Sequence, residues 1–228
     1  MGFVALLTVL ARPHRTFRAL MLRRPIVPVL TFSIAVSLLA TIPLVRLTEA
    51  RLAALDLPEE ARATAAESLR SSRWIAVASA PVGGVVRLGL AALVLGTAAL
   101  AAGVPITARG ALVVAGYGLV PRYLGSLADS TAWTLGSVAP APITGLTSLA
   151  GIVPETFSHG WIHAAASQID LFSLATLVLW SIGLAVFAGE RSRSGATAGV
   201  VAWALVTFVA VAATRVAEAM GRGTLPGG

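Results

Sequence analysis

The stretch IDLFSLATLVLWSIGLAVFAGERSRSGATAGVVAWALVTFVAVAATR, residues 169–215, decides the fold of this chain. It contains two uncharged runs of 19 and 21 residues, 171–189 and 194–214, on either side of a charged turn at 190–193. A helix needs about 20 apolar residues to cross the hydrocarbon core of a bilayer. The stretch therefore predicts two transmembrane helices joined by a short turn.

The upstream sequence predicts three more spans, because charges are scarce there too. Residues 25–45 form an uncharged run of 21 residues. The next run holds one charge, Arg87, and turns at Val104-Pro105 into a run that carries Arg122. We therefore expect an all-α, polytopic membrane helical bundle with five transmembrane helices, at about 25–45, 77–102, 109–127, 170–189 and 194–214.

The composition of the whole chain also indicates lipid as its solvent. The 228 residues are 57% hydrophobic and 12% charged, whereas soluble domains are about 45–50% apolar and ~25% charged. All 17 basic residues are arginine, and this lysine-free usage is typical of a GC-rich prokaryotic genome. The absence of cysteine excludes disulfides, thiolate metal sites and Cys nucleophiles.

The distribution of arginine predicts the orientation. The N-terminal segment 1–24 holds five arginines and no acid, whereas 128–169 contains no Arg or Lys. We therefore expect a multi-pass protein of the cytoplasmic membrane, with its N-terminus inside the cell and its C-terminus outside. The N-terminal segment is either an amphipathic helix in the membrane interface or an ordinary flank of the first span. In both cases anionic lipid headgroups are the expected partners of Arg12, Arg15, Arg18, Arg23 and Arg24.

Three other segments fall outside the expected spans. Residues 47–72 read as an exposed helical excursion, with a helix start at Leu-Pro-Glu-Glu, residues 57–60. Residues 135–157 are rich in Gly, Pro, Ser and Thr and predict a loop or a re-entrant piece. Residues 215–228 are expected to form a short flexible tail.

The two arginines inside spans are the first candidates for function. An arginine at membrane depth costs at least about 2.5–3.5 kcal/mol and normally faces protein or water. Asp129 and Asp170 are the acids that could accompany Arg87 and Arg122, and Tyr117 is grouped with them. The set is either a pocket for an anionic headgroup or solute, or a structural Arg–Asp network that holds helices together.

A second candidate site lies in the external segment. Glu155, His159 and His163 are spaced by four residues, so a helix that begins at Pro154 would place them on one face. Two imidazoles and a carboxylate could bind Zn²⁺ in a membrane-embedded enzyme. A polar helix packed at the interface is the alternative.

Most enzymatic and nucleotide-binding motifs are absent. The sequence has no G-x-x-x-x-G-K-[ST], G-x-G-x-x-G, G-x-S-x-G or H-E-x-x-H pattern. We therefore expect neither catalysis nor a cofactor. The net charge of +7 is assigned to lipid headgroups, and not to nucleic acid, because the arginines cluster before the first span. Gly195-x-x-x-Gly199 serves either a homo-oligomer or an intrachain contact.

An ordered set of segments resembles Yip1-domain integral membrane proteins. The set covers RPHRTFRALMLRRP (12–25), AGYGLVPRYLGSL (115–127), TSLAGIVPE (147–155) and the start of the quoted stretch (169–205). Ala175 departs from the family pattern, in which many members have Trp at this position. The resemblance implies five spans and no established enzymatic chemistry. Eukaryotic relatives associate with Rab-type GTPases, and some bacterial members are linked to export ABC transporters.

The sequence therefore predicts one favoured function and one alternative. The resemblance favours a non-catalytic accessory protein of a membrane transport or secretion complex, with an ABC-type permease as a partner. The alternative is a small transporter, channel or lipid-handling protein that uses an anionic-ligand pocket around Arg87 and Arg122. A hydrated cavity that reaches both arginines would favour the alternative, whereas a tightly packed bundle would favour the accessory role.

Overall fold

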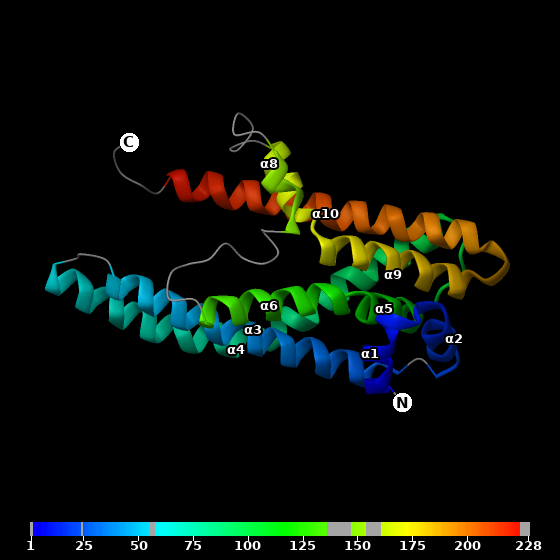
Figure 1. Cartoon of the computed structure of the whole chain (residues 1–228), viewed down its shortest axis with the longest axis horizontal. Helices are drawn as coiled ribbons and strands as arrows, with labels where there is room; N and C mark the ends of the chain where they lie inside the picture. The colour runs from blue at the N-terminus through cyan, green and yellow to red at the C-terminus, as the bar shows by residue number, and fades with distance from the viewer. Residues whose placement is uncertain (1, 24, 55–57, 136–146, 154–160, 224–228) are drawn as a thin grey trace.

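The computed structural model describes residues 2–23, 25–54, 58–135, 147–153 and 161–223, and in these ranges it contains helices and turns but no strand (Figure 1). Short 3₁₀ turns, η1 (Leu149–Ile152) and η3 (Gly189–Arg191), lie among the α-helices. The α-helices are α1 (Gly2–Ala11), α2 (Pro13–Arg23), α3 (Val27–Ala54), α4 (Glu59–Ala101), α5 (Ala108–Gly118), α6 (Val120–Leu135), α8 (Trp161–Gln168), α9 (Leu171–Ala188) and α10 (Ser192–Gly223).

Several of these helices are long and apolar enough to cross a membrane. Among the described residues there are four such spans: α4, the α5–α6 pair, α9 and α10. A fifth is reached only if α2 and α3, which are bent by 118° at their junction, are counted as one broken span. The prediction of an all-helical, multi-pass protein is therefore confirmed.

The helices α3 and α4 extend beyond the expected spans. The predicted separate excursion at 47–72 is instead divided between the end of α3 and the start of α4. Helix α4 begins after Pro58 with Glu59 and Glu60 in its first turn. At 1.5 Å per residue its 43 residues measure about 64 Å, roughly twice the hydrocarbon thickness. The two helices run side by side past the rest of the bundle (Figure 1).

Two further segments differ in local detail from the expected ones. The span expected at 109–127 is present as residues 108–131, but its helix is interrupted at Leu119 between α5 and α6, because Pro121 has no backbone N–H and its ring clashes with the preceding turn. The tail expected from 215 is helical as far as Gly223, since α10 continues past the end of its apolar run.

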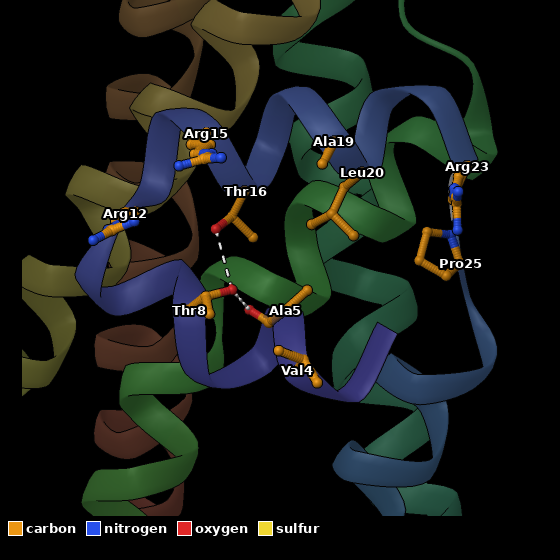
Figure 2. Close-up of a pocket in the computed structure, with 10 residues that line it drawn as sticks. All are labelled: Val4, Ala5, Thr8, Arg12, Arg15, Thr16, Ala19, Leu20, Arg23 and Pro25. Carbon is orange, nitrogen blue, oxygen red and sulfur yellow. Dashed lines mark hydrogen bonds between the residues drawn. The ribbon is translucent and has the colours of Figure 1, made fainter. Parts of the chain in front are cut away.

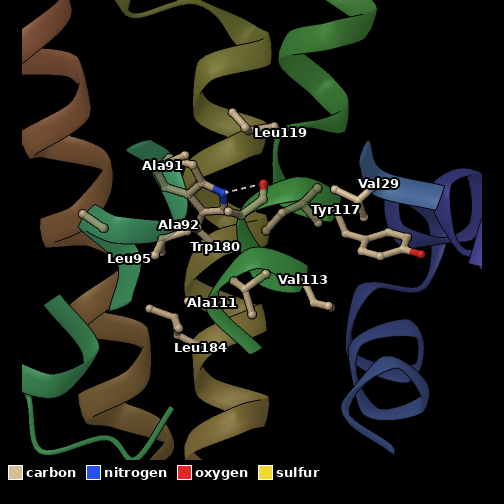
Figure 3. Close-up of a cluster of buried hydrophobic side chains, with 14 of the residues drawn as sticks. Val29, Ala91, Ala92, Leu95, Ala111, Val113, Tyr117, Leu119, Trp180 and Leu184 are labelled. Atoms are coloured by element: carbon tan, nitrogen blue, oxygen red, sulfur yellow. Dashed lines mark hydrogen bonds between the residues drawn. The ribbon is translucent and has the colours of Figure 1, made fainter. Parts of the chain in front are cut away.

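Helix α5 lies in the centre of the bundle, where it packs against α3, α4 and α9. Trp180 of α9 is 1% exposed, and its indole Nε1 donates to the Ala115 carbonyl at 3.4 Å (Figure 3). A Cβ on Gly118 would overlap the Trp180 ring. The small residues of α5 therefore admit a large aromatic side chain into the core, as small residues do between helices in lipid.

The α9–α10 pair contains the G-x-x-x-G motif. A Cβ on Gly195 would lie 2.5 Å from the Leu184 carbonyl oxygen, and a Cβ on Gly199 would lie 2.6 Å from Ser181 Cα. Both glycines thus allow α10 to approach the backbone of α9 closely. This motif serves an intrachain contact, one of its two expected uses.

Candidate functional site

A cavity of about 710 Å³ lies between α4, α6, α8, α9 and α10. It is lined by all four charged residues that the sequence placed together, Arg87, Arg122, Asp129 and Asp170. Arg87 lies on α4, Arg122 and Asp129 lie on α6, and Asp170 immediately precedes α9. The tertiary structure therefore brings Arg87 and Arg122 to one hollow.

The cavity has an apolar wall made by α4 and α10. Helix α4 presents a single face, with lining residues repeated at intervals of three and four residues. These are Gly83, Val86, Arg87, Leu90, Ala91 and Val94. Helix α10 contributes only apolar side chains, Val206, Val209, Ala210 and Ala213.

The opposite wall is polar. Helix α6 contributes Arg122, Ser126 and Asp129 at one- and two-turn spacing, and the end of α8 contributes Ser167 and Gln168. Apart from Arg87, the wall made by α4 and α10 is hydrocarbon, whereas the opposite wall carries most of the hydrogen-bonding groups, so the cavity is two-sided. A ligand that matches both walls would have an apolar part and a polar part.

Arg122 is half-buried on α6 and faces charges of both signs. Its Nη2 donates to the Gln168 carbonyl at 3.5 Å, which is long for a hydrogen bond. Electrostatic attraction from Asp170 favours its charge, and repulsion from Arg87 opposes it. The protein therefore only partly compensates the Arg122 guanidinium.

Asp170 has a structural role beside the cavity. Its Oδ1 accepts a hydrogen bond from the Ser173 backbone N–H at 2.6 Å, so Asp170 is the N-cap of α9. Because the carboxylate is held by the helix terminus, it acts on Arg122 through space and makes no direct ion pair with it in the described structure.

Arg87 differs from the other charged residues of the cavity. Its side chain is exposed, and among the described residues it makes no hydrogen bond or ion pair. It nevertheless lies near enough to Arg122 for the two guanidinium groups to repel each other. An anion between them would relieve this repulsion and supply the acceptor that Arg87 lacks.

A buried hydrogen-bonded chain supports the cavity and was not predicted from the sequence. Ser33 Oγ donates to the Gly84 carbonyl at 3.0 Å and lies 2.7 Å from the Tyr123 hydroxyl. Because the single Ser33 hydroxyl proton is used on Gly84, Tyr123 is the donor of the second bond. The only sequence signal was a polar side chain inside an apolar run, and Ser33 is one of several.

The remaining predicted site residues lie elsewhere. Tyr117 is fully buried in the hydrophobic core and does not line the cavity (Figure 3). Glu155 and His159, together with Pro154, lie outside the described residues, and His163 is half-buried on α8. The described part of the chain holds no group of three potential metal ligands.

The N-terminal arginines lie on α2 and at the turn before it. Arg12, Arg15, Arg18 and Arg23 are all exposed, whereas Arg24 lies outside the described residues. The expected interfacial segment is thus two helices, α1 and α2, and both are packed against the bundle.

No family model, curated protein or solved structure matches this chain.

Proposed function

We propose that this protein is a multi-pass protein of the cytoplasmic membrane that binds a phosphate-bearing lipid in the cavity between α4 and α10. The observation that carries the proposal is Arg87, a cation at the cavity that no described residue of the protein neutralises. In the proposed complex the lipid phosphate accepts hydrogen bonds from Arg87 and Arg122. We therefore favour a lipid-handling function over the accessory role.

The apolar wall is the reason for proposing a lipid. An acyl chain would contact Leu90 and Val94 on α4 and Val209 on α10, all of which line the cavity. Leu90 and Val209 are also exposed at the bundle surface. An amphiphile could therefore contact this wall from the surrounding bilayer without leaving hydrocarbon.

The charge balance of the cavity is consistent with one bound phosphate. Two arginines face two aspartates, but the Asp170 carboxylate already caps α9 and Asp129 has interactions of its own. Arg87 is left to be neutralised by a ligand. A lipid that also carries an ammonium group could place it near Asp129.

The test is the exchange of each arginine for glutamine in the full-length protein. Native mass spectrometry after gentle detergent extraction would count bound phospholipid, and melting in detergent would report folding. We expect Arg87→Gln to bind phospholipid at least about tenfold more weakly than the wild type, which is the effect of losing one charge-assisted hydrogen bond. Its Tm should be unchanged. Arg70→Gln is the matched control, because Arg70 is an exposed arginine of α4 remote from the cavity.

Two results would contradict the proposal. Equal lipid retention by the wild type, Arg87→Gln and Arg70→Gln would show that the cavity does not hold the phosphate. Loss of folded protein in Arg122→Leu, together with unchanged lipid binding in Arg87→Gln, would assign both arginines to a structural network.

An accessory role in a transport or secretion complex is the second proposal, and membership of the Yip1-domain family goes with it. Its support is the ordered resemblance in the sequence, including 115–127 and 169–205. Affinity purification from native membranes tests it, because a stoichiometric ABC-type permease in the eluate would favour this role. An eluate that contains only the protein and lipid would favour lipid handling.

A further inference from the structure

A second cavity, of about 720 Å³, lies at the N-terminal end of the protein between α1, α2 and Pro25 in the connection to α3 (Figure 2). Helices α1 and α2 form a hairpin around Arg12. The hairpin is fixed to the bundle, since Phe17 is 0% exposed and its ring lies against Gly183 of α9. The cavity is therefore held by packed helices.

Three arginines line this cavity, and no acidic residue does. Arg12 and Arg15 lie at one end and Arg23 at the other (Figure 2). Among the described residues, the guanidinium groups of Arg12 and Arg15 have no hydrogen-bond or ion-pair partner. The first acid of the chain is Glu49, so the hairpin itself contains no carboxylate that could compete with an anion.

Hydroxyl and apolar groups complete the lining. Thr16 Oγ1 donates to Thr8 Oγ1 at 3.3 Å, and Thr8 Oγ1 lies 3.5 Å from the Ala5 carbonyl (Figure 2). Val4 and Leu20 add hydrocarbon surface. Polar groups near Arg12 and Arg15 thus adjoin an apolar surface.

We infer that this cavity is a discrete site for a phosphate group, bound by Arg12 and Arg15 and separate from the site at Arg87. The rise from Arg15 to Arg23 is about 12 Å at 1.5 Å per residue, so one phosphate contacts the first end only. Arg23 then faces the part of the ligand beyond the phosphate. The phosphate is carried either by a lipid headgroup or by a soluble phosphate ester.

The inference differs from general attraction between a basic segment and an anionic membrane. In a diffuse interaction every arginine near the surface contributes about equally. In a built site only the arginines that line the cavity matter. Arg18 separates the two cases, because it is exposed on α2 but does not line the cavity.

The experiment uses the full-length Arg87→Gln protein in nonionic detergent, so that the other cavity does not contribute. Dioctanoyl phosphatidylglycerol and glycerol 3-phosphate are each titrated by calorimetry. We expect Arg12→Gln/Arg15→Gln to weaken binding at least about tenfold, and Arg18→Gln to leave it within about twofold. Ala19→Trp, which fills the cavity without changing charge, should weaken binding as well, with Tm measured for each variant.

The two ligands identify the source of the phosphate. Binding of the lipid alone supports a headgroup site, and binding of both supports a site for phosphate esters in general. An effect of Arg18→Gln as large as that of the double variant would overturn the inference in favour of diffuse attraction. Failure of both ligands to bind would also overturn it, whatever the outcome at Arg87.

Discussion

The Tyr123 hydroxyl lies 2.7 Å from Ser33 Oγ, and this buried bond joins α3 to α6, on which Tyr123 itself lines the cavity. Ser33 in turn donates to the Gly84 carbonyl on α4. The Phe32 ring meets the Tyr123 ring edge-on, with centroids 5.7 Å apart. Ser33 of α3 thus links the helix that carries Arg122 to the helix that carries Arg87.

We expect Tyr123→Phe to lower the free energy of unfolding by about 1 kcal/mol, the net value of a typical hydrogen bond in a protein or a bilayer. Unfolding in mixed detergent micelles would measure the change. Ser33→Ala should cost a similar amount. The double variant should lose less than the sum of the two, because both remove the same bond. Additive losses would show that the two hydroxyls do not stabilise each other.

Two substitutions of Asp170 separate its role as the N-cap of α9 from the effect of its negative charge on Arg122. Asp170→Ala removes the oxygen that accepts from Ser173 N–H and should cost about 1 kcal/mol of stability. Asp170→Asn keeps an N-cap oxygen but removes the negative charge that acts on Arg122. It should therefore melt near the wild-type temperature and bind anionic lipid more tightly. Weaker lipid binding by Asp170→Asn would contradict the assignment of the phosphate to this cavity.

Two glycines of α4 provide a matched test of the cavity wall. A Cβ on Gly83 or on Gly89 would meet nothing within 4 Å, but only Gly83 lines the cavity. Leucine at either position should raise helix propensity by up to about 1 kcal/mol, so neither variant should melt early. We expect Gly83→Leu to reduce bound lipid, as counted by native mass spectrometry, and Gly89→Leu to leave it unchanged. Equal effects of the two variants would exclude a ligand at this wall.

The break between α5 and α6 is a feature that the sequence pattern did not predict. Pro121 lies within an apolar run, so the span was expected to be continuous, whereas the structure ends one helix at Gly118 and starts another at Val120. Tyr117 and Tyr123 fall on opposite sides of this break. The first is buried in the core, and the second supports the cavity.

The sequence by itself determined the solvent of this protein and most of its helices. Charge-free runs of about 20 residues are stable as helices in the bilayer core and not in water. Asp170 before an apolar run specifies a helix start. The sequence also singled out Arg87 and Arg122, because any charge within such a run is costly.

Only the tertiary structure decided which sides of those helices meet. Lipid tails are as apolar as a protein core, so a spanning helix shows little contrast between its outer and inner faces. Sequence patterns therefore could not show that one face of α4 and the apolar side chains of α10 share a cavity with Asp170. Close packing through small residues such as Gly118, Gly195 and Gly199 sets these contacts, and it depends on the shape of partners far away in the chain.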